Sequence, residues 1–338
     1  MSVLDVIVPG LLGPFSADLP AYFSDELKQP EFKVLNTWLS RARVSHTKAD
    51  AYYASLQSLI CPQCDLSVCQ LTAEFDQVLP TKGHLYRIDP VHFKAESDHA
   101  VLLGTQLLEI ELSEAQQLID AFNNHFIEDE VTLYLGAADR WYLQTTKPLE
   151  LSFNSIDYSL GRDIKHFMPQ GDDALWWRKI LNEAQMLFFQ HGVNQQREEN
   201  RQLSINGLWL WDESFSIGES SNVYNTVYTN DVFASALANK AGSTIKNNII
   251  VEPQEHNALV IDDVYEAVCY GDVDAWLTAL RDFCQSHLPI IQRLLNSNKI
   301  SGVNIYPCDG RVFYIDRWQL LKFWKWVKTL DVYVTKAN

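Results

Sequence analysis

The spacing of apolar residues divides the first part of the chain into one strand followed by two helices. The run Val3-Leu-Asp-Val-Ile-Val8 is short and ends at Pro9-Gly10, which is typical of a buried strand that leads into a loop. From Glu31 to Ser58 the apolar residues recur at helical spacing, and Ser45-His-Thr-Lys48 marks a break between two helices. We therefore expect a sheet that begins near the N-terminus and is covered by helices.

The middle of the chain has a different pattern. His84–Phe93 and Ala100–Leu103 both have strand patterns and are joined by charged residues, which predicts a hairpin. Ser113–Phe122 has helical spacing, with its first serine as the expected N-cap. Val131–Leu135 and Trp141–Leu143 then return to strand character. This region is expected to form an α+β unit of its own.

Strand and helix patterns alternate again in the last part of the chain, and this order favours a mainly parallel sheet with helices on both faces. The clearest helix is Ala174–Gln190, because its apolar residues fall on one face. The other predicted helices are Asp231–Ala241, Val273–Leu295 and Trp318–Lys328, and the predicted strands are Gly207–Trp211, Asn248–Val251 and Ala258–Ile261.

These patterns predict an α/β core that is interrupted by an insertion. A chain of 338 residues with 47% hydrophobic content is large enough for two domains. We expect residues 1–80 and 205–338 to form a discontinuous core domain, and residues 81–204 to form an inserted α+β domain.

The charge balance restricts the possible partners. A formal net charge of −16, from 43 acidic and 27 basic residues, repels nucleic-acid phosphates, so we expect no nucleic-acid partner. A small phosphate-bearing ligand would need arginines gathered in one pocket. The N-terminus has no basic segment before its apolar residues, and no run of about 18 apolar residues occurs, so we expect a cytoplasmic protein with no membrane span.

Three of the six cysteines lie close together, at Cys61, Cys64 and Cys69. Neither a second CxxC motif nor a pair of histidines at zinc-ribbon spacing accompanies them. Chain length and expected compartment favour free thiols at a helix end over a disulfide framework, and a metal site is the weaker alternative.

The most informative local pattern lies within Asn182–Trp211, which we call the polar strip. It contains His191-Gly-Val-Asn194-Gln-Gln-Arg197 and Ser204-Ile-Asn206-Gly-Leu-Trp209-Leu-Trp211. An imidazole, two carboxamides, a guanidinium and two indoles therefore gather where a helix ends and a strand begins. A guanidinium binds a carboxylate or phosphate through two parallel hydrogen bonds, which predicts an anion site at the strip.

The two motifs resemble those of the archaeal-type, cofactor-independent phosphoglycerate mutases of the alkaline phosphatase superfamily. Gly136–Leu143 resembles the tyrosine–arginine strand of that family, and order and spacing agree over about 75 residues. The chain is more similar still to a group of bacterial proteins called phosphoglycerate-mutase-like or RpfE-type regulatory proteins. That second resemblance rests on Asp89–His92, Arg140–Tyr142, Leu181–Met186, His191–Arg197 and Asn206–Trp211.

The resemblance implies an alkaline-phosphatase-like fold and, in an active member, a serine nucleophile with two divalent metals held by aspartate and histidine. The sequence departs from this pattern at several positions. Val6–Gly10 stands where the family has an aspartate–glycine pair, and Tyr265–Trp276 has no histidine where a metal motif is expected. Tyr306–Trp318 likewise has aspartates but no histidine, and Asp212 replaces a glycine after the strip.

The sequence therefore predicts a catalytically degenerate phosphoglycerate-mutase-like protein with a regulatory or ligand-binding role, and we assign no catalytic residue. Its ligand would be a phosphorylated or carboxylated small metabolite, and a protein partner is the other candidate. Alternatively, the same side chains form a buried structural network. The expected ligand-binding residues are Arg140, His191, Asn194, Arg197, Asn206 and Trp209.

A second hypothesis is an active metal-dependent phosphoglycerate mutase or phosphohydrolase with displaced ligands. It would need manganese or zinc, whereas the first hypothesis needs no cofactor. Its candidate metal ligands are Asp262, Asp263, Asp272 and His256, although acidic residues in so acidic a chain also suit solvated loops. A third hypothesis is that the protein is purely an interaction scaffold and binds no small ligand.

Two further groups of residues leave alternatives open. Asp89, His92, Asp98 and His99 are either metal ligands or, as their spacing favours, solvated hairpin residues. The aromatic residues of Trp318–Lys328 have lysines between them, which suits docking to a partner or to a membrane interface. The alternative is a closing helix that packs on the core. The closing helix is favoured because aromatic stripes usually mark a core.

Overall fold

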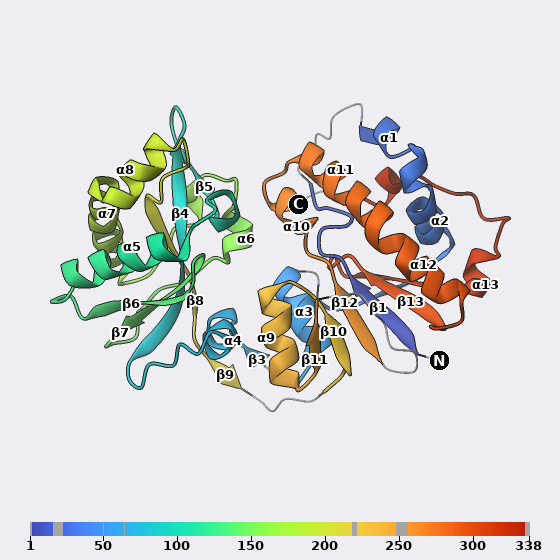
Figure 1. Ribbon diagram of the computed structural model, residues 1–338, viewed down its shortest axis with the longest axis horizontal. Helices are drawn as coiled ribbons and strands as arrows, with labels where there is room; N and C mark the ends of the chain where they lie inside the picture. The colour runs from blue at the N-terminus through green and yellow to red at the C-terminus, as the bar shows by residue number, and fades with distance from the viewer. Residues whose placement is uncertain are drawn as a thin grey trace. The chain divides into compact units, whose positions relative to one another are not determined.

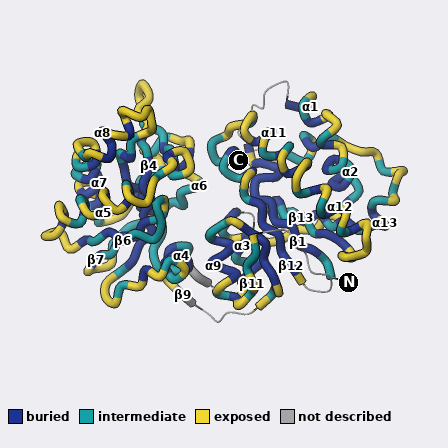
Figure 2. The backbone as a smooth tube through the Cα atoms, viewed as in Figure 1, coloured by how far each residue is buried: buried dark blue, intermediate teal, exposed yellow. Residues whose placement is uncertain are grey.

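The computed structural model describes residues 2–15, 23–49, 51–63, 65–217, 222–247 and 256–334 of the chain. It consists of two compact units. Unit 1 comprises residues 1–64 and 218–338, and unit 2 comprises residues 65–217, so unit 2 is inserted into the sequence of unit 1. In each unit the buried residues concentrate on the strands and on the helix faces that cover them (Figure 2).

Unit 1 is built on a mainly parallel sheet (Figure 1). β1 lies in the middle, between β12 and β13, and among the described strands of this sheet only β14 runs opposite to the others. The predicted α/β class with a mainly parallel sheet is confirmed. In pairing order the strands are β11 (Thr244–Lys246), β10 (Thr226–Tyr228), β12 (Asn257–Val260), β1 (Val3–Ile7), β13 (Gly302–Tyr306), β14 (Arg311–Asp316) and β2 (Arg43–His46).

Two groups of helices cover this sheet. α2 (Lys33–Arg41), α11 (Val273–Asp282) and α12 (Leu288–Asn296) share one large apolar core with the central strands. α3 (Tyr52–Ile60) and α9 (Val232–Ala241) contact each other, and α9 also contacts β10 and β11. A π-helical turn joins α11 to α12, so the long helix predicted here is confirmed. The short helices are α1 (Phe23–Glu26), η1 (Pro30–Phe32), α10 (Tyr265–Cys269), α13 (Arg317–Leu320) and η5 (Leu330–Val332).

Unit 2 is an antiparallel sheet with helices, as predicted for the inserted α+β region. The long strand β4 pairs with β8 along one edge and with β7 and then β5 along the other, and β6 pairs with β7. The strands are β4 (His84–Ala95), β5 (Ala100–Leu103), β6 (Val131–Ala137), β7 (Arg140–Thr145) and β8 (Gly207–Glu213), with a small ribbon of β3 (Asp65–Leu66) and β9 (Ser216–Ile217). The helices are α4 (Val68–Phe75), η2 (Thr105–Leu107), α5 (Leu112–His125), α6 (Ile156–Ser159), η3 (Ile164–His166), α7 (Ala174–Gln190) and α8 (Gly192–Glu199).

The boundaries of the insertion differ from those expected at 80/81 and 204/205. The units divide at 64/65 and 217/218. The physical reason is that β8 pairs with β4 through backbone hydrogen bonds, while α4 packs against both strands. Both elements therefore belong to unit 2, although the sequence pattern assigned them to the core.

Three local expectations need correction, and a fourth is not tested. The break at Ser45-His-Thr-Lys48 includes part of β2, which completes the sheet by pairing with β14. Helix α5 begins one residue before Ser113, because Glu111 forms a capping box with Glu114. The expected helix over Trp318–Lys328 is wrong, since α13 contains four residues only. The predicted strand Asn248–Val251 lies outside the described residues.

The cysteines also differ from expectation. Cys61 is disulfide-bonded, so the prediction of free thiols is wrong for this residue, while Cys64 lies outside the described residues. Cys69 is a free, buried thiol at the start of α4. No helix within the described ranges is both long and apolar enough to cross a membrane.

Candidate functional site

Arg197, the expected anion ligand of the polar strip, is almost completely enclosed in unit 2, with 1% of its surface exposed. Its Nε donates to the carbonyl of Leu203 at 2.8 Å and its Nη1 to Glu114 Oε2 at 2.6 Å. Its Nη2 donates to the carbonyl of Leu108. The guanidinium thereby joins α8 to α5 and to the loops beside them, and each of its nitrogens already has a partner.

The two asparagines of the strip bind the backbone. The Asn194 amide nitrogen donates to the carbonyls of Phe188 and Ile205, and its oxygen accepts from the Ile205 N–H, all at 2.8 Å. The Asn206 oxygen accepts from the Phe93 N–H at 2.7 Å, and its nitrogen donates to the Phe93 carbonyl at 3.1 Å. Asn206 therefore continues the pairing of β8 with β4 through its side chain.

His191 and Trp209 have local structural contacts. The His191 Nδ1 accepts from the Val193 N–H at 3.2 Å, so the imidazole is the N-cap of α8. Trp209 is buried and packs edge-on against Phe93, and its Nε1 has no hydrogen-bond partner within the described part of the chain. The contacts of the strip favour the structural alternative, a network that holds unit 2 together.

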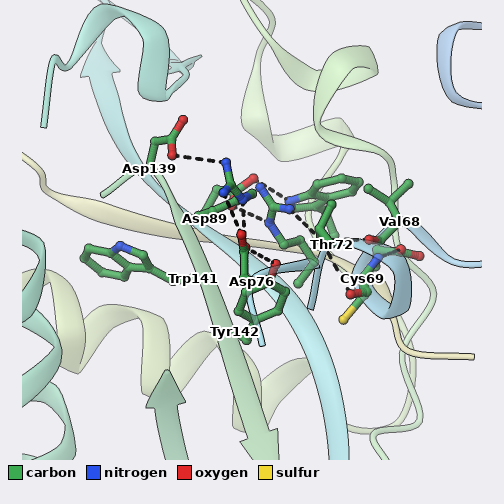
Figure 3. Close-up of polar contacts among 12 residues, drawn as sticks. Val68, Cys69, Thr72, Asp76, Asp89, Asp139, Trp141 and Tyr142 are labelled. Carbon is green, nitrogen blue, oxygen red and sulfur yellow. Dashed lines mark hydrogen bonds and ion pairs between the residues drawn. The ribbon is translucent and has the colours of Figure 1, made fainter. Parts of the chain in front are cut away.

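Arg140 is held by a carboxylate at the end of α4 (Figure 3). Its Nε and Nη2 each donate to one oxygen of Asp76 at 2.8 Å, and the Tyr142 hydroxyl donates to the same carboxylate at 2.7 Å. Burial, opposed by the charge of Arg87 and reinforced by that of Asp76, raises the pKa of Tyr142, so its phenol stays protonated and can donate. This bidentate pair fastens α4 to β7.

A second buried pair, Arg87 with Asp89, lies beside the first, since the Arg87 guanidinium is 5.6 Å from the centre of the Tyr142 ring. Figure 3 shows Asp89 near Asp76. Arg87 Nε donates to one oxygen of Asp89 at 2.7 Å, and the Trp211 indole donates to the other at 2.8 Å. Arg87 also donates to Thr72 Oγ1 at 3.0 Å and lies over the Trp211 ring. Burial raises the pKa of Asp89 despite these partners. Arg87 was not singled out in the sequence analysis. The pattern that could have revealed it is its spacing of two residues from Asp89, which places both side chains on the same face of β4.

The proposed metal cluster around Asp89 does not assemble. His92 bonds to the Ser204 carbonyl at 2.8 Å, whereas His99 contacts its exposed neighbour Asp98. Asp98 and His99 are exposed, as the favoured interpretation of solvated hairpin residues expects. That interpretation is wrong for Asp89, which is buried and paired with Arg87.

Asp212, which stands where the resembling family has glycine, caps a helix. Its Oδ2 accepts from the Cys69 N–H at 2.7 Å, at the N-terminus of α4. Burial outweighs these backbone hydrogen bonds and the nearby Arg87 charge, and raises the pKa of Asp212 to about 6. Because helix N-termini attract anions, the protein's own carboxyl group fills this position.

The four candidate metal ligands of unit 1 do not gather in one place. Asp262 and Asp263 follow β12, Asp272 caps the first turn of α11, and His256 precedes β12, where its Nε2 lies 3.6 Å from Asp5. No group of three or more histidine, cysteine, aspartate or glutamate residues that could hold a metal occurs among the residues described. The four residues therefore do not form one centre.

At the carboxyl edge of the sheet, two acidic residues follow neighbouring parallel strands. Asp231 follows β10 and Asp262 follows β12. Burial and the charge of Asp231 raise the pKa of Asp262 to about 7. The Tyr52 hydroxyl bonds to Asp231, and the Tyr52 ring stacks on Tyr265 with centroids 4.5 Å apart. Asp231 was not among the candidate site residues named from the sequence, because it was taken only as the first residue of a predicted helix.

Asp5 is the buried carboxylate of the central strand β1. Its Oδ2 accepts from the Tyr224 hydroxyl and its Oδ1 from the Asn304 amide, both at 2.7 Å. Burial, with the Asp5 charge, raises the pKa of Tyr224 well above its ordinary value, so this phenol remains a donor. Both oxygens of the first-strand aspartate thus have protein partners.

A small pocket opens at the carboxyl end of β13. Its enclosed volume is about 10 Å³, which is room for about one water-sized group, within about 200 Å³ of space that includes open solvent. Hydroxyl groups, one guanidinium and one thiol line it. The lining residues are Thr47, Ser55, Ser58, Leu59, Tyr306, Cys308 and Arg311.

Comparison with known proteins gives a distant relationship. No protein-family model matches the sequence. Over 133 residues the chain is 21% identical to the 2,3-bisphosphoglycerate-independent phosphoglycerate mutase of Methanosarcina mazei, covering 38% of this chain and 34% of that protein. The chain thus spans about a third of the length of this curated relative. This supports the resemblance to cofactor-independent phosphoglycerate mutases at the level of distant homology.

Two solved structures are similar over most of the chain. One is the cofactor-independent phosphoglycerate mutase from Thermoplasma acidophilum, with 14% identity and a TM-score of 0.36 over 94% of this chain and 90% of that one. The other is the PH0037 protein from Pyrococcus horikoshii, with 10% identity and a TM-score of 0.47 over 93% and 87% of the two chains.

Replacing Arg197 tests whether the strip is structural. We expect Arg197→Met to lower the free energy of unfolding by about 2–4 kcal/mol, because Glu114 and two carbonyls lose their buried partner. Urea denaturation measures the change, with Arg178→Met on the exposed side of α7 as the control. Equal stability of the two variants would contradict the structural assignment.

The raised pKa of Asp212 predicts a pH-dependent stability. The folded protein holds this proton up to about pH 6, whereas an unfolded aspartate releases it near pH 4, so the contribution of Asp212 to stability falls as pH rises between these values. Asp212→Asn should therefore gain about 1–2 kcal/mol over the wild type from pH 4 to pH 7. Urea titrations at both pH values measure this gain. A similar gain for the exposed Asp120→Asn would refute the assignment to Asp212.

Proposed function

We propose that this chain is a catalytically degenerate phosphoglycerate-mutase-like protein that acts by binding, in a regulatory or ligand-sensing role. The observation that carries the proposal is that Val6–Gly10, where the resembling mutases have an aspartate–glycine pair on the first strand, contains no acidic residue. The neighbouring Asp5 lies at a different register of the strand and does not replace that metal ligand, because Tyr224 and Asn304 bind its oxygens. The distant sequence similarity to a phosphoglycerate mutase supports the part of the proposal that relates this chain to that family.

The arginines of the resembling segments support the same proposal. Arg140 is bound by Asp76 and Arg197 by Glu114, each at 2.8 Å or less. A phosphate group would have to displace a carboxylate from a buried arginine, which costs the desolvation and pairing energy of that carboxylate. The ligand of this protein is therefore expected at a different place from the polar strip.

The small pocket at the end of β13 is the place where we propose that one anionic group of the ligand binds. It lies at the carboxyl ends of parallel strands, where α/β proteins commonly bind ligands. Tyr306 brings a phenol hydroxyl to it. The hydroxyl groups of Thr47 and Ser58 also line the pocket but donate to the backbone carbonyls of Ala49 and Ser55, and the Arg311 guanidinium is paired with Asp309. A hydroxyl group in this position can donate a hydrogen bond to one oxygen of a small phosphorylated or carboxylated metabolite.

One observation favours a second function, an active metal-dependent mutase or phosphohydrolase. Asp231 and Asp262 meet at the carboxyl edge of the sheet, and their mutual charge contributes to the raised pKa of Asp262. A divalent cation would relieve this repulsion by replacing the proton. Manganese or zinc bound there, with Asp263 near by, is the arrangement that this alternative requires.

Ligand binding can be tested by thermal shift with 3-phosphoglycerate as the probe. We expect millimolar probe to raise the melting temperature of the wild type by a few degrees, because a ligand that binds only the folded state stabilises it. Ser58→Leu should remove the shift by filling the pocket, whereas Ala54→Leu on the exposed side of α3 should retain it. A shift that survives Ser58→Leu would place the ligand elsewhere, and no shift in the wild type would reject this ligand.

Metal dependence separates the two functions. For the binding protein we expect the melting temperature to be unaffected by chelation, and added manganese or zinc to give no turnover of 2- or 3-phosphoglycerate. Turnover that disappears with a chelator and with Asp262→Asn would overturn the first proposal in favour of the second. The control variant is Asp120→Asn, which also removes one carboxylate but at an exposed position.

A further inference from the structure

Residues 317–328 form a short segment that is both aromatic and basic, and we call it the aromatic segment. Its sequence is Arg-Trp-Gln-Leu-Leu-Lys-Phe-Trp-Lys-Trp-Val-Lys, with four basic residues and no acidic one. In a chain of net charge −16 this is a local reversal of sign. It follows β14 and contains α13 in its first third.

The large side chains of the aromatic segment face solvent. The exposed fractions are 77% for Trp318, 83% for Phe323, 66% for Trp324 and 91% for Trp326. Leu321 is also exposed, at 61%. Packing on the core, the interpretation that the sequence favoured, is therefore wrong for these residues.

The other tryptophans show how unusual this exposure is within the protein. Of the ten tryptophans, six are buried and one is half-buried, and the three exposed ones all belong to the aromatic segment. Single exposed apolar residues are common, but adjacent exposed aromatics usually mark an interaction surface.

The backbone of the aromatic segment is fixed to unit 1 at both ends. Arg317 Nε donates to the Leu295 carbonyl at 2.8 Å, and Arg41 donates to the Leu320 carbonyl. At the far end the Lys328 N–H donates to Ser40 Oγ at 2.8 Å. The loop is therefore held on the surface by its backbone while its aromatic rings point away from the core.

We propose that the aromatic segment docks on a lipid bilayer that carries anionic headgroups. Tryptophan and phenylalanine are suited to the boundary between headgroups and acyl chains, where an apolar ring and a polar edge are both accommodated. Lys322, Lys325 and Lys328 alternate with the rings and complement negative headgroups. The segment lies in the interface and does not cross the membrane.

The acidic character of the whole chain does not prevent this docking. Charges farther than about 8–10 Å from the surface are largely screened at physiological ionic strength. The lysines next to the rings act within this distance, so the local charge decides the interaction. Binding should accordingly weaken as salt is added.

Sedimentation of the full chain with vesicles tests the proposal. We expect at least tenfold more protein to bind vesicles of phosphatidylglycerol and phosphatidylcholine than vesicles of phosphatidylcholine alone, with a blue shift of tryptophan fluorescence. Lys322→Gln/Lys325→Gln/Lys328→Gln should lose most of the anionic preference, and Trp324→Ser/Trp326→Ser should lose binding to both. Both variants should keep the wild-type melting temperature, because the replaced side chains do not pack in the core.

Matched variants in unit 2 serve as controls. Lys147→Gln/Lys165→Gln/Lys179→Gln removes the same charge from exposed lysines, and Leu175→Ser/Phe189→Ser removes exposed apolar groups, so both should bind vesicles like the wild type. Equal binding of the wild type to both vesicle types, or equal loss in the controls, would overturn the proposal. Failure to bind vesicles, with a dimer that Trp324→Ser/Trp326→Ser dissociates, would assign the segment to contact with a second copy.

Discussion

A buried charge must have a partner inside the protein, and this constraint explains the positions of the polar residues in both units. In unit 2 the carboxylates of Asp76, Asp89 and Glu114 each receive a buried or half-buried arginine. In unit 1 Asp5 receives a phenol and an amide. Each of these groups links elements that are far apart in sequence, so the same contacts that satisfy the charge also fix the packing of helices on sheets.

The same constraint explains how a sequence motif can be kept while its side chains have no free donors for a substrate. A guanidinium that binds a substrate phosphate needs free donors directed toward a cavity. Arg197 instead has a partner at each nitrogen, and Asn194 and Asn206 bind backbone groups of neighbouring segments. Residues that preserve the spacing of a family motif can thus preserve its fold, because their structural hydrogen bonds depend on the same spacing.

The sequence predicted much of the fold but less of the candidate site. Hydrophobic periodicity identified β1, the β4–β5 hairpin and α7, since each has a strong local pattern. It missed the pairing of β8 with β4, which depends on residues more than 100 positions apart. The sequence placed Arg140 and Arg197 in a motif without revealing Asp76 and Glu114, because the partner of a buried charge is chosen by tertiary packing. Asp231 and Asp262 are also brought together by tertiary packing. The strand before Asp262 was predicted from the sequence, but β10, the strand before Asp231, was not.

The short ribbon of β3 and β9 has a consequence for the modularity of the chain. Asp65 is paired with Ile217 and Leu66 with Ser216, so the first and last residues of unit 2 are hydrogen-bonded neighbours. A segment whose ends meet can be added to a host loop without stretching it, because the host has only to span the same short gap. Residues 65–217 therefore have the geometry of a cassette, which can be replaced or transferred as a unit while the strand order of the parallel sheet stays the same.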